Sequence, residues 1–230
     1  MKTLLLLLYA LLYYTYPFAQ NTTSIIVKAG TNIRDVLSTA DVFQYPQFAK
    51  GKVFFKDGSS AEAKMNYNRL VDEMHFIDPK RDTLALANEK LIKWIAINQD
   101  TFYYDQGYVR LISSTDVAKL AVKQVWIMGD TRKIGAYNTA NSTSSITSYS
   151  SYSAGSRIYN LFVNEEVVLR KVEHYYFGDR YNHFVLAGKK NLLMLFPKEQ
   201  RRIEVYLKEN KIDFSNKDDL EKAVQFLDHL

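Results

Sequence analysis

The chain has 230 residues, a formal net charge of +5 and no cysteine. The lack of cysteine excludes a disulfide framework, a thiolate nucleophile, an iron–sulfur cluster and every cysteine-based zinc site. An apolar share of 47% excludes wholesale disorder, and the length is sufficient for one or two domains with a real hydrophobic core.

Residues 1–19 have the pattern of a secretory signal peptide. Lys2 supplies a positive charge, the run from Leu4 to Leu12 is apolar, and Ala19 precedes the expected cleavage site. An uncleaved membrane anchor is the alternative, but the apolar run is shorter than the ~20 residues that a spanning helix needs. We therefore expect an exported protein of the periplasm, the cell envelope or the medium, with no transmembrane span after cleavage.

Residues 20–128 are expected to form a β-rich region. Short segments with period-two alternation are separated by turn residues such as Asp57-Gly58 and Asp105-Gln106-Gly107. Such spacing predicts an antiparallel meander that closes as a sandwich, a roll or a partial barrel. Helices over 87–96 and 116–128 remain an alternative, because short apolar runs are ambiguous. The expected strands are 52–55, 61–68, 73–78, 83–87, 91–97, 101–104, 108–112 and 118–126.

Residues 129–156 differ from both of their neighbours, since 12 of these 28 residues are Ser or Thr. A stretch this poor in apolar side chains buries too little surface to offset its ordering entropy, which predicts a loop or linker. The alternative is a binding loop, because Tyr137, Tyr149 and Tyr152 alternate with hydroxyl side chains.

Residues 157–230 are expected to form a β-hairpin followed by amphipathic helices that pack on the β-rich region. Segments 157–163 and 167–177 have strand character, and Gly178-Asp179 is expected to be a two-residue turn that leads into 181–186.

Two helices are expected after Pro197. The first would begin at Pro197 and carry Ile203, Tyr206 and Leu207 on its apolar face. Ser215 and Asp218 form a capping-box pattern for the second helix. Its apolar face would be Leu220, Val224 and Leu227.

The expected hairpin register suggests a pair of histidines. His174 would face His183 across the turn, and two imidazoles about 5 Å apart can bind a metal such as zinc. A metal needs a third ligand, and Glu173 points to the opposite face in this register. The favoured interpretation is a pair of half-buried side chains, so we assign no metal ligand and no cofactor.

Six acidic residues are candidates for the two carboxylates that a glycoside hydrolase needs. Nearly all lie at expected strand ends or turns, where Asp is favoured for local hydrogen bonding. The sequence also has no Gly-x-Ser-x-Gly elbow and no phosphate-cradling glycine loop. We therefore assign no catalytic residue. The acidic residues are Asp72, Glu73, Asp78, Asp82, Asp100 and Asp105.

Asn66 and Asn68 would project from one strand face together with Glu62 and Lys64, as a small polar binding surface or a solvated sheet face. The pI near 9.1 raises the question of nucleic acid. Residues 189–230 carry nine basic and eight acidic side chains, and this mixing argues against a nucleic-acid partner.

Several segments carry a family resemblance across most of the chain after residue 19. They are similar to uncharacterised exported proteins of Bacteroidetes-type bacteria, a group with no assigned function. The resemblance implies an envelope or secreted location and no particular activity. The segments are Gly51–Gly58, Asn66–Asn68, Asp72–Asp78, Asp82–Asn88, Leu195–Lys198 and Lys208–Lys211.

The expected fold is therefore α+β, with an antiparallel β-meander, a hairpin and C-terminal amphipathic helices. The leading functional hypothesis is an exported, envelope-associated, non-enzymatic binding or interaction module whose partner is a protein, a glycan or a lipid. The alternatives are a hydrolase acting on envelope glycans and a lipid or lipoprotein carrier. The sequence alone does not identify the binding residues.

Overall fold

The computed structural model describes residues 23–134, 140–143 and 161–230. No helix among these residues has the length and apolar character needed to cross a membrane. In chain order the elements are β1 (Ser24–Val27), β2 (Thr31–Asn32), α2 (Ile33–Val36), α3 (Thr39–Val42), β3 (Ala49–Phe55), β4 (Ser60–Asn68), β5 (Glu73–Ile77), β6 (Thr83–Ala85), the 3₁₀ turn η1 (Glu89–Leu91), β7 (Ile92–Ile97), β8 (Asp100–Tyr104), β9 (Tyr108–Ser114), β10 (Ala118–Ile134), β11 (Ala140–Thr143), β12 (Phe162–Val163), β13 (Glu166–Asp179), β14 (Phe184–Leu186), α5 (Lys189–Leu195), α6 (Gln200–Glu209) and α7 (Lys217–Asp228).

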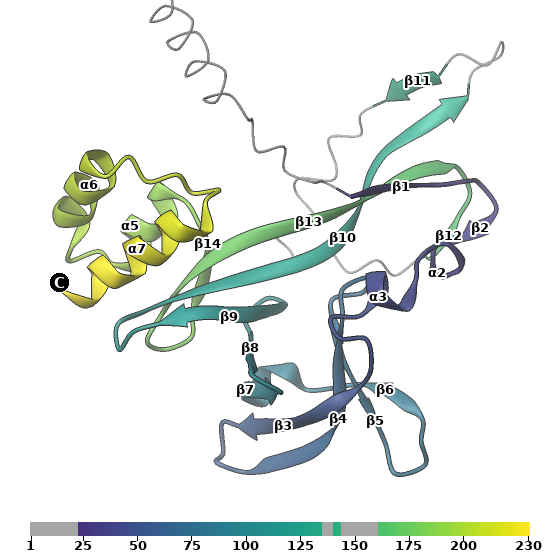
Figure 1. The fold of residues 1–230 in the computed structure, drawn as a ribbon, viewed down its shortest axis with the longest axis horizontal. Coiled ribbons are helices and arrows are strands. Elements are labelled where there is room, and N and C mark those ends of the chain that lie inside the picture. Colours follow the sequence, from purple (N-terminus) through teal and green to yellow (C-terminus); the bar gives the residue numbers. More distant parts are fainter. Residues whose placement is uncertain (1–22, 135–139, 144–160) are drawn as a thin grey trace, which may run out of the picture.

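Within the described residues, 12 strands form one sheet in the order β1-β13-β10-β9-β8-β7-β3-β4-β5-β6, with β11 on β10 and β14 on β13. Strands β2 and β12 form a separate two-stranded sheet. Figure 1 shows β10 and β13 as a long arm, with α5, α6 and α7 at one end and β1, β2 and α2 at the other. The protein is thus α+β and β-rich, with C-terminal helices, as expected.

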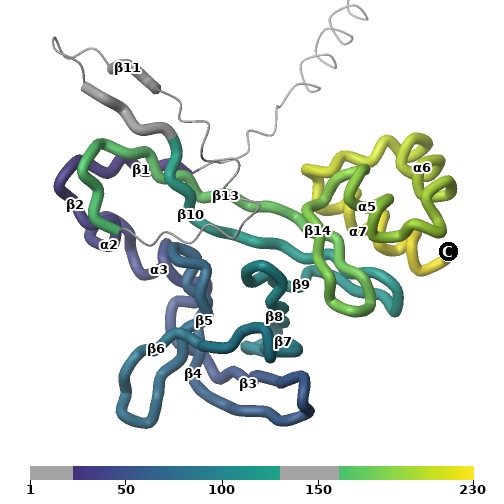
Figure 2. Tube along the Cα trace, turned by 180° about the vertical axis from the view of Figure 1, so that it is seen from behind, coloured from purple at the N-terminus to yellow at the C-terminus, as the bar shows by residue number. Residues whose placement is uncertain are grey.

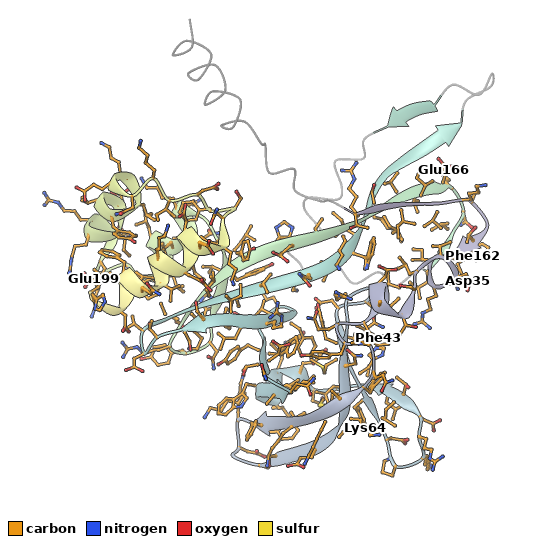
Figure 3. All side chains as sticks on the ribbon, viewed as in Figure 1. Asp35, Phe43, Lys64, Phe162, Glu166 and Glu199 are labelled. Carbon is orange, nitrogen blue, oxygen red and sulfur yellow. The ribbon has the colours of Figure 1, made fainter. Side chains whose placement is uncertain are left out.

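The part of the sheet from β3 to β8 curls beneath the β10–β13 arm, as Figures 1 and 2 both show. The end of β4 returns to β10, because the backbone N–H of Trp126 donates to the carbonyl of Arg69 at 3.1 Å. The Trp126 indole also donates to the carbonyl of Asp41, at the end of α3, at 2.9 Å. Phe43, which is labelled in Figure 3, marks this meeting point and forms a bridge with Asn68.

The interior of the curl is a hydrophobic cluster drawn from strands β3, β4, β5, β7, β8 and β9. Along β3 and β4 alternate residues point inward, which is the pattern of a sheet with one buried face, whereas β7 contributes Ile92, Ile95 and Ile97 across a register shift. The curl is therefore held by apolar contacts between strands that are far apart in the sequence. The buried members are Val53, Met65, Tyr67, Met74, Ile92, Ile95, Ile97, Phe102 and Tyr108.

A second cluster lies between the helices and the sheet. Helix α7 packs on the start of β10, α5 contacts β13, and α6 packs on α5, so the apolar faces of the helices share one cluster with the sheet and the amphipathic pattern expected for the tail is confirmed. The helices thus contribute to the same folded body as the strands. The buried members are Ala118, Leu120, Phe177, Leu192, Ile203, Leu207, Leu220, Ala223, Val224 and Leu227.

The starts of the last two helices differ from the expectation. Helix α6 begins at Gln200, so Pro197 lies before the helix and Glu199 is its N-cap. The N-cap of α7 is Asn216. Its Oδ1 accepts from the backbone N–H groups of Asp218 and Asp219 at 2.9 and 3.2 Å. The expected capping box on Ser215 is wrong, because its hydroxyl donates to Asp213 instead.

The Ser/Thr-rich stretch 129–156 is in part regular structure. Strand β10 continues to Ile134, and Ala140–Thr143 pair with it as β11. The rest of the stretch, including Tyr137, Tyr149 and Tyr152, lies outside the described residues.

Candidate functional site

A buried ion pair joins the turn after β4 to the middle of β10. Lys123 Nζ lies 2.9 Å from Asp72 Oδ2, and the two side chains are 7% and 5% exposed. Asp72 Oδ1 also accepts from the Tyr67 hydroxyl at 2.7 Å and from the Tyr108 backbone N–H at 3.2 Å. Because the carboxylate meets a cation and two neutral donors, its desolvation is compensated. The ion pair and its hydrogen bonds therefore connect β4, β9 and β10.

The local chain is shaped to bring Asp72 to this position. Its φ is 52°, in the left-handed region that Asp tolerates better than most residues. The Asn68 side chain supports the turn, since its Oδ1 accepts from the backbone N–H groups of Leu70 and Val71 at 3.0 and 3.3 Å. Gly107 closes over the pair, where a larger residue would have no space.

Two side chains of β13 form the rim of this cluster. His174 is the cross-strand partner of Lys123, and Tyr176 is the partner of Ala121. Burial, followed by the charge of Lys123, lowers the pKa of His174. Burial, followed by the charge of Asp72, raises the pKa of Tyr176 to about 12. With its charged atoms almost sealed from water, the cluster serves to hold the strands together.

The proposed histidine pair does not form. Strand β13 runs to Asp179 and the turn lies at 180–182, so the register is displaced from the expected one. His183 is exposed and lies opposite Asp179, whereas His174 is half-buried beside Lys123 on β10. Among the residues that the structure describes, no group of three His, Asp or Glu side chains could hold a metal ion.

The Asp179 side chain explains the longer turn. Its Oδ1 accepts from the backbone N–H groups of Tyr181 and His183 at 2.8 and 3.0 Å. Asn182 takes a φ of 67°, which this residue type also tolerates. The pair Gly178-Asp179 therefore does not reverse the chain itself, and Asp179 is the first residue of the turn that does.

Some of the acidic residues considered for hydrolysis make local hydrogen bonds, as expected. Asp78 Oδ1 accepts from the backbone N–H of Asp82 at 2.8 Å, within the turn between β5 and β6. Glu73 Oε2 lies 3.2 Å from the ring Nε2 of His75 on the same strand.

Two other acidic residues hold segments that are far away in the sequence. Asp100 accepts from the Tyr45 hydroxyl at 2.6 Å and from the Arg110 guanidinium at 3.3 Å. Asp105 accepts from the backbone N–H of Phe184, at the start of β14, at 2.7 Å. Each of these two carboxylates thus has a structural role, because it links segments that are distant in the sequence. The sequence could not indicate this role.

Asn66 and Asn68 do not form an exposed surface. They are 1% and 3% exposed, so both interpretations of the sequence were wrong. Asn66 exchanges two hydrogen bonds with the backbone of Tyr45, accepting at 3.0 Å and donating at 2.8 Å. The end of β4 contacts the segment before β3. This tertiary contact buries Asn66 and Asn68, which strand alternation would place on the exposed face.

The outer face of β3 and β7 carries the feature that we consider as a candidate binding surface. Phe54 and Trp94 are cross-strand partners, with ring centroids 4.9 Å apart and ring planes inclined by 34°. Lys52 Nζ lies 5.6 Å from the centroid of Phe54, and Lys93 Nζ lies 4.8 Å from that of Trp94. We call these four residues the outer platform. Val53, between Lys52 and Phe54, points into the core instead.

More charges surround the outer platform on the same sheet face. The register pairs Lys52 with Glu62, and Lys50 with Lys64. Lys50 and Lys52 lie 3.8 and 3.2 Å from the Glu62 carboxylate. Figure 3 labels Lys64 on the curled sheet, well away from Glu199 at the helical end.

Sequence reasoning missed the outer platform. The alternation of Lys52 and Phe54 was visible, and so was Trp94 within a strand. The sequence could not indicate that β3 pairs with β7, because three other strands, β4, β5 and β6, separate them in the chain.

No protein-family model, curated protein or solved structure matches the chain. The function is therefore argued from the geometry of the molecule itself.

Proposed function

We propose that the protein is an exported, envelope-associated, non-enzymatic binding module, that its curled sheet is a partial barrel, and that its outer platform binds a saccharide. The observation that carries the proposal is the pairing of Phe54 with Trp94. These two rings lie side by side on the outer face of the sheet and take no part in the hydrophobic core on the other face.

The ring geometry suits a saccharide. One face of a pyranose ring presents several C–H groups, which pack on an aromatic face while the hydroxyl groups remain in water. With centroids 4.9 Å apart and planes inclined by 34°, the two rings contact each other in a tilted arrangement, and both side chains remain partly exposed beside the lysines. Neighbouring strands fix both side chains, so little ordering is required when a ligand binds.

The alternatives receive less support from the described residues. The hydrolase hypothesis needs two converging carboxylates, whereas Asp72 and Asp100 are both engaged with cationic partners. The lipid-carrier hypothesis needs an apolar space within the sheet. The inward side chains Met65, Ile95 and Phe102 are at most 1% exposed and belong to one packed cluster.

A binding experiment with point variants tests the proposal. We would titrate a panel of neutral and acidic oligosaccharides into the purified protein, secreted by cells that express the full chain, and measure heats by calorimetry. We expect Trp94→Ala to weaken binding about tenfold, the equivalent of 1.4 kcal/mol. Tyr181→Ala is the matched control, because Tyr181 is 81% exposed on the remote 180–182 turn.

Two results would contradict the proposal. One is a wild-type protein that binds no member of the panel. The other is a Trp94→Ala variant that binds with the affinity of the wild type, which would place the surface elsewhere on the molecule.

A further inference from the structure

Resting on the proposed function, we infer that the ligand of the outer platform is an anionic saccharide. Its sugar rings pack on Phe54 and Trp94, and its acidic groups contact the lysine ammonium groups at the edge. This inference narrows the ligand from saccharides in general to those that carry negative charge.

The first supporting observation is the charge of the sheet face. Lys52 and Lys93 lie against the two rings, Lys50 and Lys64 lie farther along the same face of β3 and β4, and Glu62 is the acidic residue that the described register places among them. Within the described residues, Lys64 and Lys93 have no carboxylate at ion-pair distance. The surplus of positive charge beside the two rings favours an anion.

The second observation is how Lys93 reaches this face. Strict alternation would place Lys93 and Trp94 on opposite faces of β7. The register between β3 and β7 shifts at this point, between Phe54 and Phe55. Such irregularities re-aim side chains, and Lys93 Nζ indeed lies 4.8 Å from the Trp94 ring centroid. The platform thus combines an aromatic face with a cation that regular pairing would direct elsewhere.

The third observation concerns Glu62, which lies between Lys50 and Lys52. A hydrogen bond from Lys52 and the charges of both lysines lower the pKa of Glu62. An ionised carboxylate accepts hydrogen bonds from sugar hydroxyl groups, so Glu62 adds a contact to the sugar itself. A polyanion without sugar rings would make no contact with the faces of Phe54 and Trp94.

The test compares an acidic saccharide with its uncharged methyl ester. Calorimetric titrations would use an oligogalacturonate and its methyl ester, at low and high sodium chloride. We expect the ester to bind at least about tenfold more weakly, and the acid to lose affinity as salt rises. Lys93→Met removes the ammonium group and keeps the aliphatic chain. It should weaken binding of the acid several-fold more than it weakens binding of the ester. Lys198→Met, in the remote tail, is the matched control.

The outcomes separate the inference from the proposed function. If acid and ester bind equally and Trp94→Ala abolishes both, the anionic preference is wrong and saccharide binding stands. If only neutral members of the wider panel bind, the inference is likewise wrong. If no saccharide binds, both statements fail.

Two further probes test whether negative charge alone is sufficient for binding. Inorganic polyphosphate or phosphatidylglycerol vesicles that bind as tightly as the oligogalacturonate, without dependence on Trp94, would overturn both statements. They would then indicate a non-specific attraction to anions or to a lipid surface. We expect each of these probes to bind at least about tenfold more weakly than the acid at the higher salt concentration.

Discussion

Asp72 and Lys123 are 51 residues apart in the sequence, yet their charged atoms lie 2.9 Å apart in the interior of the protein. Asp72 belongs to the turn after β4, and Lys123 lies in the arm that carries the helices. The ion pair therefore fixes the curled part of the sheet to the long arm.

Removal of one member of the ion pair should strongly destabilise the fold. Lys123→Met leaves the Asp72 carboxylate buried without its cation, which typically costs about 3–5 kcal/mol of unfolding free energy. The double variant Asp72→Asn/Lys123→Met should lose less than the sum of the two single losses, because neither charge remains. Urea denaturation provides the measurement.

Lys222→Met is the control for this prediction. Its ion pair with Asp219 lies on the surface of α7, with the lysine side chain 60% exposed. Its denaturation midpoint should remain close to that of the wild type. A Lys123→Met protein as stable as the Lys222→Met protein would contradict the role that we assign to the buried pair.

Gly107 should tolerate no side chain. A Cβ atom there would lie 2.1 Å from Lys123 Nζ and 2.5 Å from Asp72 Oδ2, and the φ of Gly107 is +118°. Gly107→Ala must therefore separate the ion pair as well as strain the backbone, and we expect a loss of about 3 kcal/mol or more.

Gly58→Ala separates the two causes of that loss. Gly58 also has a positive φ, +88°, but nothing lies within 4 Å of its Cβ position. This variant should lose only about 1 kcal/mol, from backbone strain alone. Equal thermal shifts for the two alanine variants would show that Gly107 is required only for its φ.

His174 should make the protein less stable in mild acid. Burial and the charge of Lys123 lower its pKa in the folded state, with Glu173 acting in the opposite direction. The unfolded chain therefore binds the proton more readily. Stability is unaffected above the unfolded pKa of about 6.5 and is lost as pH falls from there through the folded pKa.

The variant His174→Gln checks this pH dependence. The difference in unfolding free energy between pH 7.5 and pH 5.5 should be smaller in the variant than in the wild type, with urea titrations at both values as the measurement. His183→Gln is the control, because His183 is exposed. Identical pH dependence in wild type and His174→Gln would refute the prediction.

The side chain of Asn216 should stabilise the N-terminus of α7. Its side chain accepts from the backbone N–H groups of Asp218 and Asp219, so Asn216→Ala should cost about 1 kcal/mol. Ser215→Ala removes only a contact with Asp213 and should cost less. A lower melting temperature for Ser215→Ala than for Asn216→Ala would contradict this assignment and favour Ser215 as the capping residue.

Much of the secondary structure was predictable because its signals are local. The alternation of Ala63, Met65 and Tyr67 identified β4, and the helical spacing of Leu220, Val224 and Leu227 identified the buried face of α7. Both patterns reflect one buried face of one element. The turn at 180–182 was misplaced by two residues, because an Asp that begins a turn and one that lies inside it look alike in sequence.

The sites were not predictable, because they depend on which strands meet. Asn66 appeared exposed until the segment around Tyr45 covered it. His174 faces Lys123 on β10, since β13 is longer than the expected strand and pairs along that arm.

The sequence by itself determined the composition-level facts and the order of the elements: a chain without cysteine, a β-rich body, an amphipathic helical tail, and an N-terminal pattern from which we expect export. Only the tertiary structure decided that Asp72 meets Lys123 and that Phe54 lies beside Trp94. The physical reason is that local periodicity records whether a side chain is buried, whereas its partner is set by sheet topology. Distant strands are brought together by the burial of the whole core, to which every element contributes.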